Sequence, residues 1–229
     1  MKLLQQLYPI RFVIFIISLT AVLFGTLIIP TGLFESVFAP LFFTVNLLAG
    51  ILLISKKKIP RNIFIGLLVF TVLTYIVSAL FEQESENLTY VRFTILFLFY
   101  CMVTFEIIGQ VWHSEFVNRT VILGLISGYI CLGLIGFFIC TSIEFIDPGS
   151  FTGLVSQQMN PEENREGLLY YSYITLLTIG YGDIVPTTKL ARNAAMLIGL
   201  LGQFYMVIIT AIVVGKFISQ RNSDPQGDR

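Results

Sequence analysis

The chain has 229 residues, of which 55% are hydrophobic and 12% are charged, and its formal net charge is zero. A soluble domain carries about 25% charged residues, so this composition indicates an integral membrane protein. The zero net charge argues against nucleic acid as a partner. The three cysteines, Cys101, Cys131 and Cys140, lie in apolar runs without disulfide-framework or metal-site spacing, and no cofactor is expected.

Six apolar runs are long enough to cross a membrane, because a spanning helix needs about 20 apolar residues. They cover residues 10–29, 37–55, 62–81, 90–112, 120–143 and 189–218. The first run is too long for the core of a signal peptide, so we expect it to be retained as a helix. A seventh run is too short to span and predicts a re-entrant helix over residues 166–178.

Basic residues in the loops predict how the chain is oriented. With six spanning helices these residues gather on one side, which the positive-inside rule assigns to the cytoplasm. They are Lys2, Arg11, Lys56, Lys57, Lys58, Arg61, Arg119, Lys216 and Arg221. Both termini are therefore predicted to be cytoplasmic, in a multi-pass protein of the cell membrane. Most acidic residues fall on the opposite side, where they would either raise the local concentration of cations or simply keep the loops soluble.

The stretch TIGYGD, from Thr178 to Asp183, interrupts the helical pattern after the aromatic run LLYYSYITLL. Irregular backbone at membrane depth is tolerated only where protein buries it or where it lines a water-filled path. Gly180 and Gly182 permit left-handed backbone conformations, which can turn successive carbonyls to one side, and a dehydrated cation needs such oxygen ligands. Ile179 and Tyr181 are expected to face away and pack behind the loop. One loop forms only one wall of a ring, so we expect a homotetramer.

TIGYGD stands between a short aromatic helix and a long final helix, and in this context it resembles the signature of tetrameric potassium channels, whose related filter reads TVGYG. The resemblance covers about residues 120–219 and implies passive, K⁺-selective conduction across the lipid bilayer. It implies that the K⁺-binding filter is formed by Thr178, Ile179, Gly180, Tyr181 and Gly182. The first four would supply carbonyl oxygens, Thr178 would add its hydroxyl, and Gly182 would shape the outer mouth.

The resemblance extends to residues that would support the filter. Tyr170 and Tyr171 fall where the family often has two tryptophans, and Tyr170 is expected to hydrogen-bond Asp183. Ile174 occupies a position where some members carry a glutamate, so no carboxylate pair is expected behind the filter.

In the final helix the resemblance implies a hinge and a pore lining. Gly202 lies where the family often has a hinge, with Gly199 one turn earlier, although isolated glycines in membrane helices also mark close packing. Both interpretations are open. Thr210, Val214 and Ile218 would face the inner pore and its cytoplasmic constriction.

The predicted fold is an all-α membrane protein with six transmembrane helices, a re-entrant pore helix and a selectivity-filter loop. Residues 1–112 would form a four-helix voltage-sensor-like domain, 113–219 the pore domain and 220–229 a short cytoplasmic tail. The pore domain would consist of an outer helix (120–143), an outer loop or turret (144–165), the pore helix (166–178), the filter (178–183) and an inner helix (189–218).

The fourth run, YVRFTILFLFYCMVTFEIIGQVW, lacks the charges of a voltage sensor. It contains Arg92 and no other Lys or Arg, and each charge contributes only about 2.3 kcal/mol per 100 mV. We therefore expect no steep voltage gating. The sequence leaves the gating stimulus open among membrane tension, lipid, pH, a partner and a constitutively open pore gated at the filter.

Polar residues inside the predicted spans have both functional and structural interpretations. Glu106, Gln110 and His113 are spaced so that they share one helix face, where they could sense protons or lipid or pair with Arg119. Alternatively, this face satisfies its own hydrogen bonds. Asn46 in the second run is expected to hydrogen-bond a neighbouring helix.

Two other functions fit parts of the sequence. A regulatory, non-conducting channel-like subunit would share the layout, although the intact filter argues against it. Gly180 to Asp183 also matches the GxGD string of intramembrane aspartyl proteases, whose chemistry needs two aspartates in one site. The remaining aspartates, Asp147, Asp224 and Asp228, fall in a loop and the tail, so the chain is not expected to be an enzyme.

Overall fold

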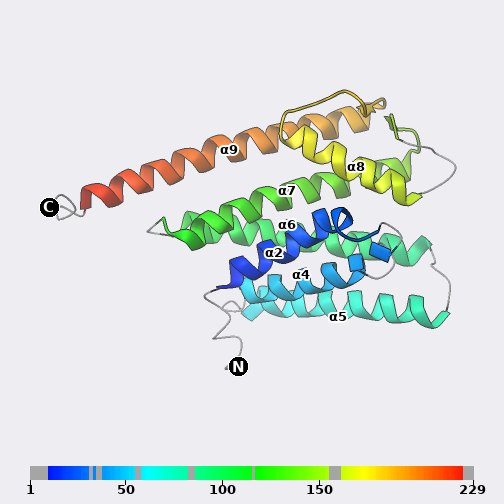
Figure 1. Ribbon diagram of the computed structural model, residues 1–229, viewed down its shortest axis with the longest axis horizontal. Coiled ribbons are helices and arrows are strands. Elements are labelled where there is room, and N and C mark those ends of the chain that lie inside the picture. The colour runs from blue at the N-terminus through cyan, green and yellow to red at the C-terminus, as the bar shows by residue number, and fades with distance from the viewer. Residues whose placement is uncertain are drawn as a thin grey trace. The chain divides into compact units, whose positions relative to one another are not determined.

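The structure is a computed structural model that describes residues 10–30, 33–34, 38–54, 58–81, 86–114, 117–154 and 161–223. These residues are mostly helical (Figure 1). The helices are α2 (Arg11–Phe24), the 3-10 turn η2 (Gly25–Leu27), α4 (Ala39–Ile54), α5 (Lys58–Phe81), α6 (Glu86–Trp112), α7 (Arg119–Ile146), α8 (Pro161–Leu176) and α9 (Lys189–Ser223). Two short strands, β1 (Phe151–Thr152) and β2 (Val185–Pro186), pair antiparallel.

The chain divides into two compact units. Unit 1 comprises Met1–His113 and Asn118–Gly128, and unit 2 comprises Ser114–Val117 and Tyr129–Arg229. The boundary between the units along the chain falls within α7, whose residues up to Gly128 belong to unit 1. The boundary predicted from the sequence lies earlier, at residues 112–113, because the whole of α7 is one apolar run and was assigned to the pore domain.

Unit 1 is built around α4, which contacts α2, α5 and α6. Its interior combines aliphatic and aromatic side chains, and the rings of Phe64 and Phe99 lie 5.1 Å apart. Gly50 lets α4 approach this pair, since a Cβ at that position would lie 2.6 Å from the Phe99 ring. Close packing of this kind is what holds helices together where lipid removes the hydrophobic driving force.

A buried polar cluster joins three helices of unit 1. Asn46 of α4 is fully buried. Its amide nitrogen donates to the Ser18 hydroxyl of α2 at 2.8 Å, and its amide oxygen accepts from the Tyr100 hydroxyl of α6 at 3.0 Å. The expectation that Asn46 bonds a neighbouring helix is confirmed, and it bonds two.

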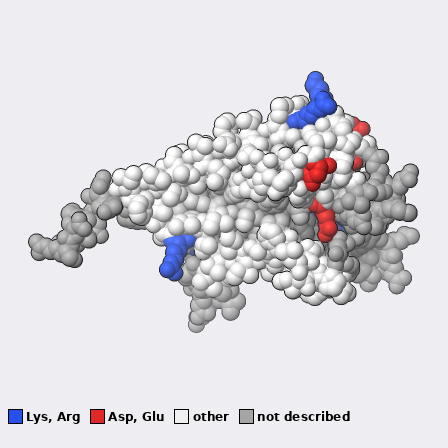
Figure 2. Space-filling view, turned by 45° about the horizontal axis from the view of Figure 1, so that its top comes forward, with Lys and Arg blue, Asp and Glu red and all other residues white. Residues whose placement is uncertain are grey.

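Three helices within the described residues are long and apolar enough to cross a membrane. They are Tyr90–Trp112, Arg119–Ile146 and Lys189–Ser219. Three further apolar helical stretches, Arg11–Leu27, Ala39–Ile54 and Arg61–Val77, are shorter. The face seen in Figure 2 is largely uncharged, as expected of a membrane protein. Three of the six predicted spans are therefore supported by length and composition, and the six-span topology stays a prediction.

The boundaries of the pore-domain elements differ from the predicted ones. The predicted pore helix corresponds to α8, which begins at Pro161 rather than 166 and ends at Leu176 rather than 178. Residues 161–165 are polar, and their polarity predicts a loop. However, proline suits the first position of a helix, and acidic residues are favourable near a helix N-terminus.

The other two predicted helices are longer than expected. The predicted outer helix corresponds to α7, which extends beyond 120–143 at both ends, and the predicted inner helix corresponds to α9, which continues past 218 to Ser223. The connection from α7 to α8 is thus shorter than the predicted turret of 144–165. Its residues 155–160, and residues 224–229 of the predicted tail, lie outside the described residues.

Candidate functional site

The loop that follows α8 has an alternating backbone. The φ angles are 58° at Thr178, 57° at Gly180 and 81° at Gly182. The start of the loop is folded back onto α8, because the Ile174 carbonyl oxygen accepts the amides of Ile179 at 2.9 Å and Gly180 at 3.3 Å. Left-handed residues at every second position turn the chain without forming a helix.

The two glycines behave as the sequence predicts, whereas Thr178 was not anticipated. No atom lies within 4 Å of a Cβ built on Gly180 or Gly182. In a single chain these glycines are therefore required by their backbone angles rather than by lack of space. Thr178 adopts its positive φ despite a branched side chain, a conformation that costs about 1–2 kcal/mol. Strain of this kind concentrates at functional sites.

Most of the loop is exposed in a single chain. The side chains of Ile179 and Tyr181 are 49% and 72% exposed. The sequence predicts that they pack behind the loop, but within one chain they do not. Irregular backbone with unsatisfied polar groups is not tolerated in contact with lipid, so other protein or water must surround this loop. The expected packing of the two side chains therefore depends on those surroundings.

Tyr170 and Asp183 form a hydrogen bond across the outer end of the loop. The Tyr170 hydroxyl bonds the Asp183 carboxylate, and this contact is the main cause that lowers the pKa of Asp183. The same bond raises the pKa of Tyr170, since it stabilises the neutral phenol beside a carboxylate. The predicted partner of Asp183 is thus in place. Both groups are at the exposed mouth of the loop rather than in a closed site.

Tyr171 and Ile174 lie behind the loop on the buried side of α8. Tyr171 is 4% exposed, and its ring stands edge-on to the Phe151 ring of β1 with the centroids 5.1 Å apart. The Ile174 side chain is buried, while its backbone carbonyl receives the two loop amides. The sequence singles out Ile174 by its side chain, whereas the role of its carbonyl oxygen depends on the backbone fold and cannot be read from the residue type.

Three side-chain hydrogen bonds attach α8 to α7 within unit 2. The Ser172 hydroxyl donates to the carbonyl of Gly133, and the Tyr173 hydroxyl donates to that of Ile130 at 2.7 Å. In return, the Tyr129 hydroxyl donates to the Leu176 carbonyl at 3.3 Å. None of these residues was singled out from the sequence, because hydroxyl-bearing residues in an apolar helix give no sign of their partners. Together they fix the helix from which the loop emerges.

The two glycines of α9 have different surroundings. A Cβ on Gly202 would overlap the carbonyl oxygen of Leu176, whereas no atom lies within 4 Å of a Cβ on Gly199. Gly202 therefore permits close packing of α9 against the end of α8, which was the alternative to a hinge. In this structure α9 is one continuous helix through both positions.

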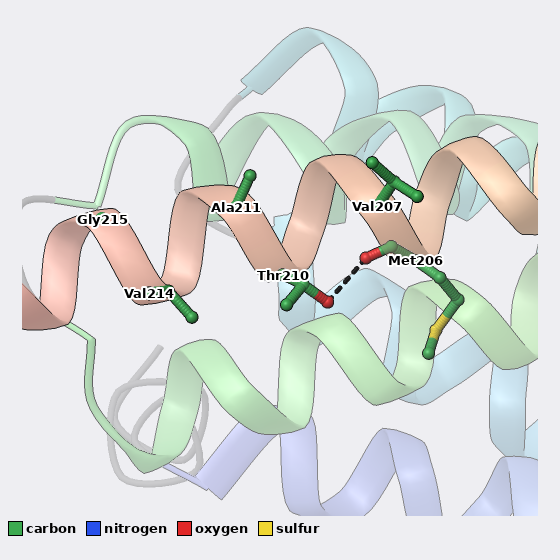
Figure 3. A pocket seen from close by; sticks show the side chains of 6 residues that line it. All are labelled: Met206, Val207, Thr210, Ala211, Val214 and Gly215. Atoms are coloured by element: carbon green, nitrogen blue, oxygen red, sulfur yellow. Dashed lines mark hydrogen bonds between the residues drawn. The ribbon is translucent and has the colours of Figure 1, made fainter.

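The residues predicted to line the inner pore lie on the second half of α9. Thr210 and Val214 line an open, mainly apolar hollow (Figure 3). The other lining residues are Met206, Val207, Ala211 and Gly215. The Thr210 hydroxyl donates to the carbonyl of Met206 at 2.7 Å, so it is satisfied within its own helix. Ile218 is half exposed and is not among the lining residues.

The polar face of α6 is hydrogen-bonded within unit 1. The Gln110 side chain donates to the Leu53 carbonyl at 3.1 Å and to the Glu106 carboxylate at 3.4 Å, and it accepts from Arg11 at 3.4 Å. His113 contacts the Gly109 carbonyl at 2.8 Å. Gln110 thus joins α2, α4 and α6. These contacts favour the structural interpretation of this face, and Arg11 is a basic partner of Gln110.

The fold and the loop together define an α-helical membrane protein in which the short helix α8 leads into a loop with positive φ at Thr178, Gly180 and Gly182. A family model described as "Ion channel" matches residues 124–219, which include most of α7, all of α8, the TIGYGD loop and most of α9. Residues 124–219 are therefore similar to an ion-channel domain, and the matched family is one of channels rather than enzymes. No solved structure matches the chain significantly.

Proposed function

We propose that the protein is a K⁺-selective channel that conducts K⁺ passively across the cell membrane. The observation that carries this proposal is the alternation of positive φ at Thr178, Gly180 and Gly182 inside the segment matched by the ion-channel family. Alternating left-handed residues allow neighbouring carbonyls to face a common line, and rows of carbonyl oxygens replace the hydration shell of K⁺ in selective filters. Carbonyls of residues 178–181 and the Thr178 hydroxyl would be the ligands, and Gly182 would shape the mouth.

We infer that the channel is a homotetramer. Each chain contributes one loop, and a ring of carbonyls needs several copies around one axis. The exposed Ile179 and Tyr181 side chains and the largely uncovered second half of α9 are surfaces that such neighbours would cover. The predicted orientation, with both termini in the cytoplasm, would place the acidic outer loops at the extracellular mouth.

We also propose that voltage does not gate the channel steeply. Arg92 is the only Lys or Arg in α6. It is 8% exposed, and its guanidinium lies 4.8 Å from the centre of the Tyr75 ring. One charge held against an aromatic ring supplies far less than the several charges per subunit that make opening steeply voltage-dependent.

Flux through reconstituted protein tests the function. The purified chain in liposomes should release K⁺ down its gradient and exclude Na⁺. Gly180→Ala should reduce this selectivity, because alanine resists the positive φ of 57° at this position. Gly66→Ala is the matched control, since Gly66 lies within α5 with no atom within 4 Å of its Cβ position. It should conduct as the wild type does.

Each part of the proposal has its own contrary result. Equal K⁺ and Na⁺ flux would refute selectivity. Assembled protein that passes neither ion would favour the non-conducting regulatory subunit. The mass of the detergent-solubilised complex should correspond to four chains, and a stable dimer would refute the tetramer. A steep sigmoidal conductance–voltage curve would refute the absence of voltage gating.

A further inference from the structure

The first part of α7 is packed within unit 1, although the helix continues into unit 2. Residues up to Gly128 belong to unit 1, and α7 runs on without a break to Ile146. The buried residues of this first part recur at the i, i+3, i+4 and i+7 spacing of one helix face. They are Val121, Gly124, Leu125 and Gly128. Ile122 and Ile126 point away from this face and are 46% and 45% exposed. One face of α7 is therefore already covered in a single chain.

Gly124 lies at the centre of this face and contacts both α2 and α6. A Cβ built on it would lie 3.0 Å from Cε1 and 3.3 Å from Cζ of the Phe12 ring, and 3.5 Å from Cγ2 of Val111. Phe12 and Val111 are each 3% exposed. We call these three residues the Gly124 seat. Because Gly124 has no side chain, the ring lies directly against the α7 backbone, and such close packing holds helices together within membranes.

The connection between α6 and α7 is short and is closed at both ends. The two helices are separated by residues 113–118. The amide of His113 still donates to the last turn of α6, and the side-chain oxygen of Asn118 caps α7 by accepting the Val121 amide at 3.0 Å. Residues 114–117 remain between these bonds, and four residues span at most about 14 Å. The chain therefore turns back directly from α6 onto its own α7.

The connection is also bonded to a later helix of the same chain. The Ser114 carbonyl accepts the Lys216 ammonium of α9 at 2.5 Å, and both residues belong to unit 2. For unit 1 of another copy to pack on the same face of α7, Phe12 and Val111 of the first chain would have to leave the seat. The short, bonded connection opposes such a movement.

We propose that, in the assembled protein, unit 1 of every chain stays docked on the α7 of its own chain through the Gly124 seat. The alternative is an exchange in which unit 1 packs on the α7 of a neighbouring copy, as identical chains do in domain swapping. The partner of the surface formed by Phe12 and Val111 is thus the same chain. The consequence rests on the proposed homotetramer: a signal received by one unit 1 would act on the TIGYGD loop of its own chain.

A disulfide across the seat tests the docking. Val111→Cys and Gly124→Cys are combined in a chain whose native cysteines are replaced, by Cys101→Ser, Cys131→Ala and Cys140→Ala. Because Cγ2 of Val111 lies 3.5 Å from the Cβ position of Gly124, the two Cβ atoms are near the separation of about 3.5–4.5 Å that a disulfide requires. Mild oxidation of the assembled complex in detergent should link the two cysteines within one chain. The product should run as a single chain in a denaturing, non-reducing gel and should lose both maleimide-reactive thiols.

Mixed complexes separate the two arrangements. When Val111→Cys and Gly124→Cys are carried by different, separately tagged chains of one complex, no link should form between them. A disulfide-linked pair that bears both tags would overturn the proposal. In the matched control, Ile122→Cys replaces Gly124→Cys, because Ile122 is exposed on another side of α7. It should form no link to Val111→Cys within a chain.

A second pair of variants tests the seat without cysteines. Phe12→Ala empties the seat and Gly124→Leu overfills it, so each should lower the midpoint of thermal unfolding by about 5–10 °C. Combined in one chain, the two substitutions should restore most of the midpoint, since leucine can fill the space of the lost ring. Placed on separate chains of one complex, they should not. Recovery only in the mixed complex, or no recovery in the double variant, would overturn the proposal.

None of these measurements requires conduction, so failure of the docking and failure of the proposed function are distinguishable. A complex that passes no K⁺ but links within single chains would refute the channel function and retain the docking. A complex whose mass differs from four chains, with the same links, would refute the homotetramer alone. Selective K⁺ conduction together with links between differently tagged chains would refute the docking alone.

Discussion

Gly202 of α9 lies against the carbonyl oxygen of Leu176, the last residue of α8, and a Cβ at Gly202 would overlap that oxygen. The same oxygen accepts the Tyr129 hydroxyl of α7 at 3.3 Å. The end of α8, from which the TIGYGD loop emerges, is therefore a point where three helices of unit 2 meet. The missing side chain at Gly202 is what allows α9 to approach it.

Gly202→Ala should destabilise unit 2 and reduce K⁺ flux. The added methyl group must displace backbone at the end of α8, and overpacking of this kind costs about 1–3 kcal/mol. Thermal unfolding of the detergent-solubilised protein should show a lower midpoint for this variant. Flux through liposomes should fall in parallel, because α8 positions the filter loop.

Gly199→Ala provides the control and also tests the hinge interpretation. No atom lies within 4 Å of its Cβ position, and alanine favours a helix over glycine by roughly 1 kcal/mol. The variant should unfold at the same or a higher temperature and conduct normally. A clear change of opening and closing in Gly199→Ala, with stability preserved, would instead support a hinge at this turn.

Removing a partner of Asn46 should weaken unit 1. Tyr100→Phe deletes the hydroxyl that donates to the Asn46 amide oxygen at 3.0 Å and leaves that oxygen buried without this donor. The expected loss is about 0.5–2 kcal/mol, the range of interhelical hydrogen bonds within membranes. Thermal unfolding of Tyr100→Phe, Asn46→Leu and the double variant would measure the coupling. Strictly additive losses would show that the two side chains do not act together.

The sequence predicts which residues are exceptional better than it predicts their partners. The positive φ of Gly180 and Gly182 follows from residue type, but that of Thr178 does not, because a branched residue rarely adopts it. Asn46 is recognisable as a polar residue in an apolar run, yet Ser18 and Tyr100 are brought to it only by packing. The sequence supports the hinge and packing interpretations of Gly202 equally, and only the position of the Leu176 carbonyl oxygen distinguishes them.

The ends of helices are predicted poorly for a related reason. Apolar runs locate the buried parts of helices, so the polar first turns of α8 were assigned to the turret. Pairings between distant residues are not predicted at all. The Thr187 hydroxyl donates to the carbonyl of Gly149, 38 positions earlier, and no local pattern encodes such a pairing.

Glu106→Gln should leave the pH dependence of K⁺ current unchanged. The Glu106 carboxylate accepts from Gln110 at 3.4 Å, and Gln110 also bonds the Leu53 carbonyl. A glutamine side chain can supply the same acceptor without charge. Current recorded across a range of internal pH would check this. A shift of the pH response in Glu106→Gln would restore the proton-sensing interpretation.

Gln110→Ala should have the larger structural effect. It removes contacts with α2 and α4 at once and leaves the Leu53 carbonyl without this donor, which should cost about 1–3 kcal/mol. A lower unfolding midpoint for Gln110→Ala than for Glu106→Gln is therefore expected. The reverse order would show that the carboxylate, rather than the amide, holds this face together.

The hydrogen bond between Tyr170 and Asp183 should make the outer mouth sensitive to acid and alkali. Because the Tyr170 hydroxyl lowers the pKa of Asp183 below its ordinary value of 3.8, the bond stabilises the folded mouth above pH 3.8. This stabilisation is lost as the pH falls through the lowered pKa. The raised pKa of Tyr170 acts at the other end: its contribution is full below 10.0 and is lost as the pH rises through the raised value.

Replacing Tyr170 should move the acid limit of conduction to higher pH. In Tyr170→Phe the carboxylate loses the main cause of its lowered pKa, so loss of current under external acid should begin at a higher pH than in wild type. Tyr170→Trp is the matched control because the indole N–H remains a donor but does not ionise. It should keep much of the acid tolerance and lose the sensitivity to alkali. Identical external pH profiles for the three proteins would show that this hydrogen bond does not govern the mouth.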